Sequence, residues 1–311
     1  MGVVAPVSAD LHQFLTDSAR RWPDSTALVC DAGQLSFSEL FARSEQVARL
    51  FAEAGLTRGS HVIVLSTNNV SYVATYHACA MLGLILVPVN AHLQPAEIAW
   101  ILEDSAPRAA LVESPFVETF EQAAELAGTP SVKRFISGDA RAGWSEITAI
   151  SSTATQLPEQ SPDPDSQVVQ MYTSGTTGRP KGVMLSHANV ASMVETWLTE
   201  IGLTHENSRF LHVMPLFHVG GLLHCLSPLA AGATLYLQPK FEPRAALAAL
   251  REAEITDTIL VPAMIQRLLA TCSSDASFPH LRQIIYGASL TPPSLLHAAK
   301  QRFDCDFTQG Y

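Results

Sequence analysis

The chain has 311 residues, with 19 Lys and Arg against 29 Asp and Glu, so its formal net charge at pH 7 is −10. This balance disfavours a nucleic-acid partner, whose phosphates require a basic face. Charged residues make up 15% and apolar residues 47% of the chain, whereas an average globular protein has roughly 25% charged residues. Much of the chain must therefore be buried, which excludes global disorder, and its length predicts about two domains.

Short apolar runs alternate with helical patterns in the first half of the chain. Because the runs are continuously apolar, they predict strands covered on both faces, as in a parallel sheet with crossover helices. Ser36 and Glu39 form a capping box that predicts a helix start near Phe37. The predicted strands are 26–30, 61–65, 84–89 and 108–112, and the predicted helices are 38–53, 71–82, 95–103 and 115–127.

The composition changes at 151–167, where Ser, Pro and acidic residues predominate. Such a segment predicts an exposed linker, and it would separate a first α/β subdomain, 1–150, from a second, 168–311. The alternation of strands and helices then resumes. The predicted strands are 168–173, 210–214, 234–237, 258–261 and 283–286, and the predicted helices are 187–201, one from 220, 243–253, 263–271 and 292–301.

Cellular location is predicted from the cysteines and the N-terminal residues. The cysteines form no Cys-x-x-Cys pair and are odd in number, which indicates buried free thiols in a reducing compartment. The first ten residues, MGVVAPVSAD, show no targeting signal. Two segments without charged side chains, 59–96 and 210–239, are interrupted by polar residues or prolines, so neither predicts a transmembrane segment. We therefore expect a cytoplasmic protein.

The segment TSGTTGRPKG, at 173–182, directly follows a predicted buried strand. Its glycines expose backbone N–H groups, its hydroxyls add donors, and Arg179 and Lys181 supply positive charge in a stretch, 173–186, without an acidic residue. These features favour phosphate binding over an ordinary flexible surface loop. The spacing differs from that of the P-loop, G-x-x-x-x-G-K-[S/T].

The string YTSGTTGRPKGVMLSH resembles the phosphate-binding signature of the adenylate-forming (AMP-binding) superfamily, of the acyl-CoA synthetase or fatty-acid–CoA ligase type. Three further segments resemble this family in the expected order, namely PLFHVGG at 215–221, YGASL at 286–290 and QGY at 309–311. The resemblance implies an α/β fold of two packed subdomains with mostly parallel sheets, which would form most of a large N-terminal domain. The family's C-terminal part, with a Mg²⁺-binding Glu and a lysine that assists adenylation, would be absent. We therefore expect this chain alone to be inactive.

The resemblance also implies three groups of site residues. The ATP phosphates would be bound by Thr173, Ser174, Gly175, Thr176, Thr177, Gly178 and Lys181, with Thr173 also holding Mg²⁺. The adenine would lie against Gly287, Ala288, Ser289, Gln309, Gly310 and Tyr311. The acyl group would be bound by His218, Val219, Gly220 and Gly221. The catalytic residues would be His218, Lys181 and Thr173, whereas His187, His212 and His224 are expected to be core histidines.

The reaction implied by the resemblance is activation of a carboxylic acid to acyl-AMP and then to acyl-CoA, with ATP, Mg²⁺ and CoA. The apolar helix predicted after His218 favours a hydrophobic, fatty acid. An aryl acid is an alternative, as is a peptide-synthetase-type adenylation domain, although that type usually has an Asp where His218 follows Phe217. A non-catalytic nucleotide- or acyl-binding scaffold is a third hypothesis. Uncovered apolar surface would favour self-association, so a homo-oligomer is also considered.

Overall fold

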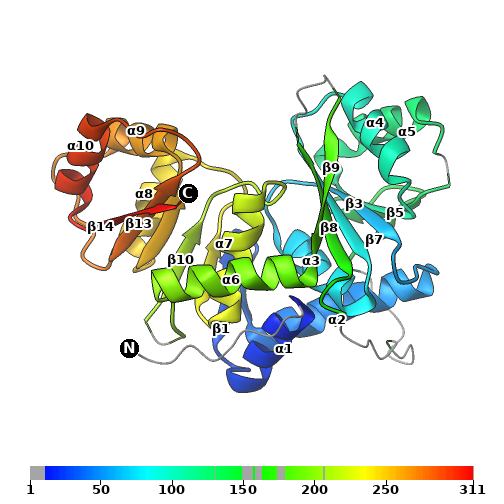
Figure 1. Ribbon diagram of the computed structural model, residues 1–311, viewed down its shortest axis with the longest axis horizontal. Helices are drawn as coiled ribbons and strands as arrows, with labels where there is room; N and C mark the ends of the chain where they lie inside the picture. The colour runs from blue at the N-terminus through cyan, green and yellow to red at the C-terminus, as the bar shows by residue number, and fades with distance from the viewer. Residues whose placement is uncertain are drawn as a thin grey trace.

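The computed structural model describes residues 11–129, 131–148, 157, 163–173, 179–205 and 207–310. Within them the chain forms two seven-stranded, mostly parallel sheets that lie side by side (Figure 1). The α/β class predicted from the sequence is confirmed. Among the helices of this described part, none combines the length and the apolar character needed to cross a membrane.

The first sheet has the strand order β7-β6-β5-β3-β4-β8-β9, and its neighbouring strands are parallel except β8 and β9. Val62 and Val64 join one core with α2 and α3, whereas Ile63 and Leu65 join another with α4 and α5. Both faces are buried, which explains the continuous apolar runs. The strands are β3 (His61–Leu65), β4 (Ile85–Val89), β5 (Ala109–Glu113), β6 (Lys133–Ser137), β7 (Ser145–Glu146), β8 (Gln167–Thr173) and β9 (Lys181–Ser186). The helices are α2 (Phe37–Glu53), α3 (Val70–Leu82), α4 (Pro95–Ser105), the 3₁₀ turn η1 (Ser114–Phe116) and α5 (Val117–Leu126).

The second sheet has the order β14-β13-β12-β10-β11-β1-β2 and is parallel except for β1 and β2. Phe210 faces the core shared with α1 and α7, whereas Leu211 faces the core beneath α8, α9 and α10. The strands are β1 (Thr26–Cys30), β2 (Gly33–Ser36), β10 (Arg209–His212), β11 (Thr234–Leu237), β12 (Asp257–Leu260), β13 (Gln283–Gly287) and β14 (Asp306–Gly310). The helices are α1 (Leu11–Arg21), α6 (His187–Ile201), α7 (Val219–Ala230), α8 (Pro243–Glu252), α9 (Pro262–Thr271) and α10 (Pro293–Phe303).

Each sheet contains strands from both sides of the predicted linker. Strands β1 and β2 come from the first 36 residues but extend the second sheet, and β8 and β9 follow the linker but extend the first sheet. The predicted division into 1–150 and 168–311 therefore does not coincide with the sheets, because strand pairing joins segments far apart in the sequence. Most of 151–167 lies outside the described residues, and Gln167 already belongs to β8.

Most predicted elements agree with the structure to within two or three residues at their ends, and the capping box at the start of α2 is confirmed. The backbone N–H of Glu39 donates to Ser36 Oγ at 3.2 Å, and the N–H of Ser36 donates to Glu39 Oε2 at 2.7 Å. Elements that the sequence did not predict are α1, β2, β6, β7, β9 and β14. The segment 173–182 is therefore not entirely a loop, since its last two residues begin β9.

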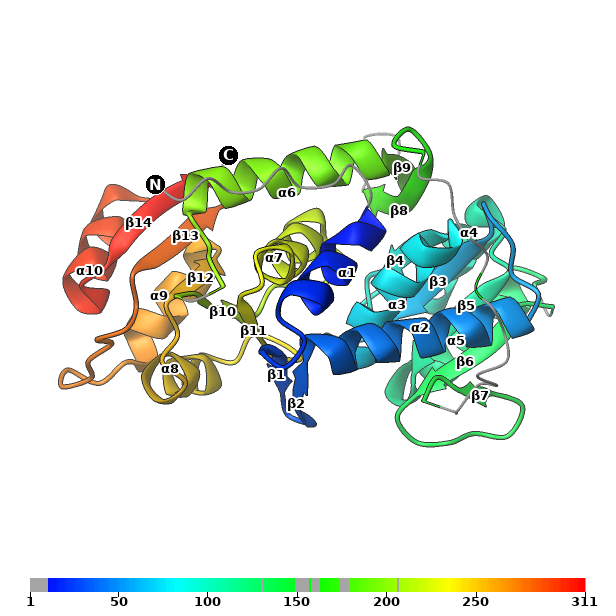
Figure 2. The ribbon, with the colours of Figure 1, turned by 90° about the horizontal axis from the view of Figure 1, so that it is seen from below.

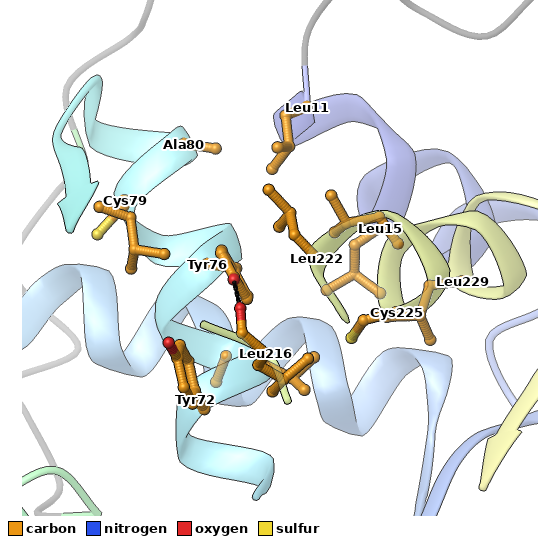
Figure 3. Close-up of a cluster of buried hydrophobic side chains, with 14 of the residues drawn as sticks. Leu11, Leu15, Tyr72, Tyr76, Cys79, Ala80, Leu216, Leu222, Cys225 and Leu229 are labelled. Carbon is orange, nitrogen blue, oxygen red and sulfur yellow. Dashed lines mark hydrogen bonds between the residues drawn. The ribbon is translucent and has the colours of Figure 1, made fainter. Parts of the chain in front are cut away.

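A shared core holds the two sheets together. In Figure 3, Leu11 and Leu15 of α1 meet Tyr76 of α3 and Leu222 of α7, and all four side chains are at most 1% exposed. Helix α6 bridges the sheets on the outside and runs from the end of β9 to β13 and β14 (Figures 1 and 2). The cysteines are free; Cys79 and Cys225 are buried as expected for core thiols, whereas Cys30, Cys272 and Cys305 are partly exposed.

Candidate functional site

In each sheet the parallel strands end at a common carboxyl edge. At one strand of each sheet, successive crossover connections lead to opposite sides. From β3 the chain crosses to β4 on one side and later returns to β5 on the other, and from β10 it crosses to β11 and later to β12 in the same way. Ligands of open α/β sheets bind outside the carboxyl ends of the strands at such points. The loops after β3 and β10 are therefore expected to border a ligand site.

The Asn68 side chain joins the carboxyl edges of the two sheets. It follows β3 of the first sheet, and its Nδ2 donates to the carbonyl oxygens of Met214, at 2.9 Å, and Gln238, at 3.0 Å, which follow β10 and β11. The N–H of Leu216 donates to Asn68 Oδ1 at 2.9 Å. The two carboxyl edges thus meet at this amide, which is 3% exposed.

A ring contact and a hydrogen bond reinforce this junction. The ring of Phe217, after β10, lies 6.5 Å from that of His92, after β4, and 4.7 Å from that of His218, centroid to centroid. From α3, the Tyr76 hydroxyl donates to the Leu216 carbonyl oxygen at 2.6 Å (Figure 3). The loop 213–218 is therefore fixed by side chains of the first sheet, although it belongs to the second.

Glu113, the last residue of β5, lies beside the end of β3. Its Oε2 accepts hydrogen bonds from Ser66 Oγ at 3.1 Å, from the Thr67 N–H at 2.8 Å and from Thr67 Oγ1 at 2.8 Å. Three donors on one carboxylate oxygen fix the turn that presents Asn68 to the second sheet.

Two of the predicted phosphate-binding residues, Thr173 and Lys181, lie at the end of the β8–β9 hairpin. Thr173 and Lys181 are register partners in this antiparallel pair, and both are exposed. Arg179 is also exposed nearby in the chain. Ser174, Gly175, Thr176, Thr177 and Gly178 lie outside the described residues. The structure therefore brings together Thr173 and Lys181 at the carboxyl end of β8, with a cationic side chain on the returning strand.

A hydrogen-bonded network anchors the hairpin below this tip. The Tyr172 hydroxyl donates to Asp104 Oδ2 at 2.6 Å and accepts from Gln170 Nε2 at 2.8 Å. Loss of hydration and the nearby Asp104 carboxylate raise the pKa of Tyr172, so the phenol keeps its proton. Gly182 pairs with Tyr172 in this hairpin, and a Cβ at Gly182 would lie 2.6 Å from Gln170 Nε2, so the Gln170 side chain would have to shift. The hairpin is thereby held against α4.

The predicted acyl-binding residues start helix α7. His218 is the N-cap residue, with extended backbone, and its side chain is exposed and does not cap the helix. The first N–H groups of a helix lack intrahelical acceptors and carry partial positive charge, so they suit a carboxylate. Gly220 has open space at its Cβ position, whereas a Cβ at Gly221 would clash with the Pro215 carbonyl. Partial loss of hydration lowers the pKa of His218, which favours the neutral imidazole.

The described residues of the predicted adenine-binding group lie at the carboxyl ends of β13 and β14. Gly287 and Gly310 are register partners, and a Cβ on Gly287 would clash with the Gly310 carbonyl oxygen. Ala288 takes a left-handed conformation with φ of 66°, and Ser289 and Gln309 are exposed. Tyr311 lies outside the described residues. The small residues let the two strand ends approach closely.

The three histidines expected in the core are buried. His187 accepts a hydrogen bond at Nδ1 from the Leu11 N–H at 3.3 Å. Burial lowers the pKa of His212 to about 3 and that of His224 to about 4. The His224 ring packs edge-on against Trp197 of α6, with centroids 4.3 Å apart. None of the three is exposed at the carboxyl edges.

Asn68 and Tyr76 are the residues of this junction that sequence reasoning missed. A signal for Asn68 was available, since four polar residues, Ser-Thr-Asn-Asn at 66–69, directly follow a buried strand. Tyr76 gives no such signal, because it lies in a helix that is buried on all sides.

Comparisons with known proteins identify the family of the chain. The model of the AMP-binding enzyme family matches residues 15–311. A fatty acid–[acyl-carrier-protein] ligase, ScoC, from Streptomyces coeruleorubidus is 31% identical, over 98% of this chain and 58% of its own length. An indoleacetate–CoA ligase from Aromatoleum aromaticum is 32% identical, over 94% of this chain and 58% of its own length. The chain thus spans less than two thirds of these curated relatives.

Solved structures share the fold. The inhibitor-bound N-terminal domain of FACL13 from Mycobacterium tuberculosis matches with a TM-score of 0.87 at 24% identity, over 97% of this chain and 75% of that domain. The o-succinylbenzoate CoA synthetase MenE from Bacillus subtilis matches with a TM-score of 0.77 at 26% identity, over 96% of this chain and 58% of that protein. The predicted fold, two packed α/β subdomains of an adenylate-forming N-terminal domain, is confirmed.

Proposed function

Because the chain belongs to the AMP-binding enzyme family, we propose that the protein takes part in the ATP-dependent activation of a hydrophobic carboxylic acid, first to acyl-AMP and then to acyl-CoA. The observation that carries the proposal is the common location of the described residues of the four motif segments. The β8–β9 tip, the loop before α7 and the ends of β13 and β14 all lie at carboxyl edges, and those edges meet at Asn68.

In the proposed first step, a carboxylate oxygen of the acid attacks the α-phosphorus of ATP. The new bond is P–O to the acyl oxygen, and the bond that breaks joins the α-phosphorus to the oxygen bridging to the β-phosphate, so pyrophosphate leaves. Lys181 and Arg179 would offset the negative charge on the departing phosphates. No protein nucleophile is needed, and catalysis would come from positioning and charge compensation.

His218 and the start of α7 would orient the acid. A neutral imidazole can donate one hydrogen bond to a carboxylate oxygen without forming a full ion pair, which leaves the carboxylate nucleophilic. The open space at Gly220 would admit the acyl group beside the helix. The second step would replace AMP by a thiol, which in this proposal is that of CoA.

Magnesium fits the described residues only in part. Thr173 is exposed at the end of β8, so its hydroxyl is available as one oxygen ligand. Among the described side chains there is no group of three or more His, Cys, Asp or Glu that could hold a metal. Mg²⁺ commonly binds through substrate phosphates and few protein ligands. It would therefore enter with ATP, as a charge-neutralising partner of the phosphates.

Binding to this chain tests the proposal directly. We would measure thermal unfolding with sulfamoyl-adenosine analogues of octanoyl-, phenylacetyl- and benzoyl-AMP, which mimic the adenylate and cannot be hydrolysed. At 100 times Kd a ligand of the folded state adds about 2.7 kcal/mol, which corresponds to about 4 °C in a protein of this size. The increase should be clearly smaller in Lys181→Ala and in His218→Ala. The matched control is Lys133→Ala, an exposed lysine at the amino end of β6.

The outcomes separate the hypotheses. Selective stabilisation by the octanoyl analogue supports a fatty acid, and stabilisation by the phenylacetyl or benzoyl analogue supports the aryl-acid alternative. The names of the two relatives include both acid classes, and both CoA and a carrier protein as the thiol. Stabilisation by ATP alone, with no analogue bound more tightly, would favour the nucleotide-binding scaffold. A cytoplasmic location and a homo-oligomer stay predictions; fractionation and sedimentation would test them.

A further inference from the structure

Two buried side chains, Asn68 and Tyr76, form hydrogen bonds to the loop that carries His218. Asn68 uses both hydrogens of its amide, toward Met214 and Gln238, and its oxygen accepts the Leu216 N–H. Tyr76 donates to the carbonyl oxygen of the same Leu216 at 2.6 Å. The backbone N–H and carbonyl of Leu216 are therefore both hydrogen-bonded to side chains from the segment that follows β3 of the first sheet.

The loop has little freedom beyond these bonds. The N–H of His218 donates to the Pro215 carbonyl oxygen at 3.1 Å, which closes the turn two residues after Leu216. The absence of a side chain at Gly221 lets α7 approach that same carbonyl. Leu216 itself is fully buried. A shift of Leu216 would therefore move His218 and the first turn of α7 together.

Hydrogen bonds also fix the position of Asn68 relative to the first sheet. It follows the turn that the Glu113 carboxylate holds through Ser66 and Thr67, and its own N–H donates to the Pro239 carbonyl oxygen at 3.3 Å. Because Asn68 is 3% and Tyr76 1% exposed, water cannot easily replace either side chain. The first sheet also carries Thr173 and Lys181 on β8 and β9.

We propose that Asn68, assisted by Tyr76, is a positioning residue that fixes His218 relative to the phosphate-binding end of β8 and β9. This inference rests on the proposed function, in which His218 orients the acid and Lys181 faces the phosphates of ATP. In-line attack requires that the acid and the α-phosphorus of ATP be held in a fixed relative position. In this proposal the residues that bind them belong to different sheets. Asn68 sets that geometry without touching either substrate.

Asn69 provides a matched control. It is the adjacent residue and also bonds through both ends of its amide, since its Oδ1 accepts the Tyr72 N–H at 2.9 Å and its Nδ2 donates to Ser66 Oγ at 2.8 Å. These bonds cap α3 and hold the same turn, but they reach no residue of loop 213–218. A purely structural role predicts similar effects from Asn68→Ala and Asn69→Ala, whereas a positioning role predicts different ones.

The first arm of the test uses the chain without ligand and measures amide hydrogen exchange by NMR. Asn68→Ala should speed exchange of the Leu216 amide by about tenfold or more, because its acceptor is gone, and leave the Tyr72 amide protected. Asn69→Ala should speed exchange of the Tyr72 amide and leave the Leu216 amide protected. Tyr76→Phe, which keeps the ring in the core, should shift the His218 ring resonances without altering the fold. Unchanged Leu216 exchange in Asn68→Ala and unchanged His218 resonances in Tyr76→Phe would overturn the proposal.

The second arm measures binding of the same sulfamoyl adenosines by calorimetry in a double-mutant cycle. Asn68→Ala should weaken binding about tenfold to a hundredfold, in line with the cost of a small misplacement, and Asn69→Ala should weaken it much less. In a His218→Ala background, Asn68→Ala should have almost no further effect, since it acts through His218. Equal weakening in both backgrounds would overturn the proposal. If wild type binds no analogue, the proposed function fails, and the exchange arm alone decides whether Asn68 fixes the loop.

Discussion

Lowering the pH from 7.5 to 5.5 should destabilise this fold through three buried histidines. His77 on α3, His212 at the end of β10 and His224 on α7 are at most 3% exposed. Burial removes the water that stabilises an imidazolium, and it lowers the pKa of His77 and His212 to about 3 and that of His224 to about 4. All three are therefore neutral in the folded chain at pH 5.5.

The magnitude follows from proton linkage. In the unfolded chain each imidazole has a pKa of about 6.5, so acidification protonates the unfolded state and leaves the folded state neutral. Each histidine then lowers the free energy of unfolding by about 1.4 kcal/mol between pH 7.5 and 5.5, and the three together by about 4 kcal/mol. This stability is fully present above the unfolded pKa and is lost as the pH falls below it. Typical domains have about 5–15 kcal/mol in total.

Urea unfolding at the two pH values and equal ionic strength measures the effect. His77→Leu should reduce the pH-dependent loss by about a third, because the unfolded chain then binds one proton fewer. The control is His280→Gln, which removes an exposed imidazole and should leave the loss unchanged. An unfolding free energy that is equal at pH 7.5 and 5.5, or a loss that His77→Leu does not alter, would refute the reasoning.

Further substitutions test the local geometry of the site and of the fold. Gly221→Ala should destabilise the chain by about 1–3 kcal/mol in urea unfolding, because its Cβ would clash with the Pro215 carbonyl; Gly220→Ala, with open space at its Cβ, should instead stabilise by up to about 1 kcal/mol. Gly287→Ala should weaken binding of sulfamoyl adenosines in calorimetry, since the added methyl would separate the ends of β13 and β14. Ser36→Ala should cost about 1 kcal/mol in unfolding free energy through loss of the N-cap of α2.

Buried parallel strands and their crossover helices could be predicted from the sequence because both faces of each sheet are covered. The run at 61–65 is apolar on successive residues for this reason. Strands β9 and β14 could not be recognised in the same way, since they lie at sheet edges and most of their residues are at least partly exposed. Helix α1 was missed although its buried positions, Leu11, Phe14, Leu15 and Ser18, follow helical spacing.

Pairing between distant strands was the part that local patterns could not supply. Nothing in the run 26–30 indicates that it pairs with β11, about 200 residues later, and the composition of 151–167 predicts a boundary between two subdomains. The sheets cross that boundary because β8 pairs with β4. Pattern reasoning identifies elements, whereas sheet order depends on contacts that the pattern does not encode.

For the site, the residues that would bind substrate could be predicted from the sequence better than the residues that hold them in place. The cations of 173–182 and the small residues at 287–289 follow from what phosphates and a flat ring require, and the structure puts both groups at carboxyl edges. Asn68 acquires its role only through partners 146, 148 and 170 residues away. Such a contact is invisible to motif spacing, although a polar run directly after a buried strand is a usable signal.

The central claim is that one adenylate site forms where the carboxyl edges of the two sheets meet. Chemical-shift mapping of the backbone amides during titration with octanoyl-, phenylacetyl- and benzoyl-sulfamoyl adenosine tests it most directly. We expect the largest shifts together at Lys181, Gly221 and Gly287, each from a different motif segment, for the analogue that binds. Shifts confined instead to the polar hollow of about 550 Å³ at the amino end of β10, lined in part by His205 and Arg209, would contradict the claim.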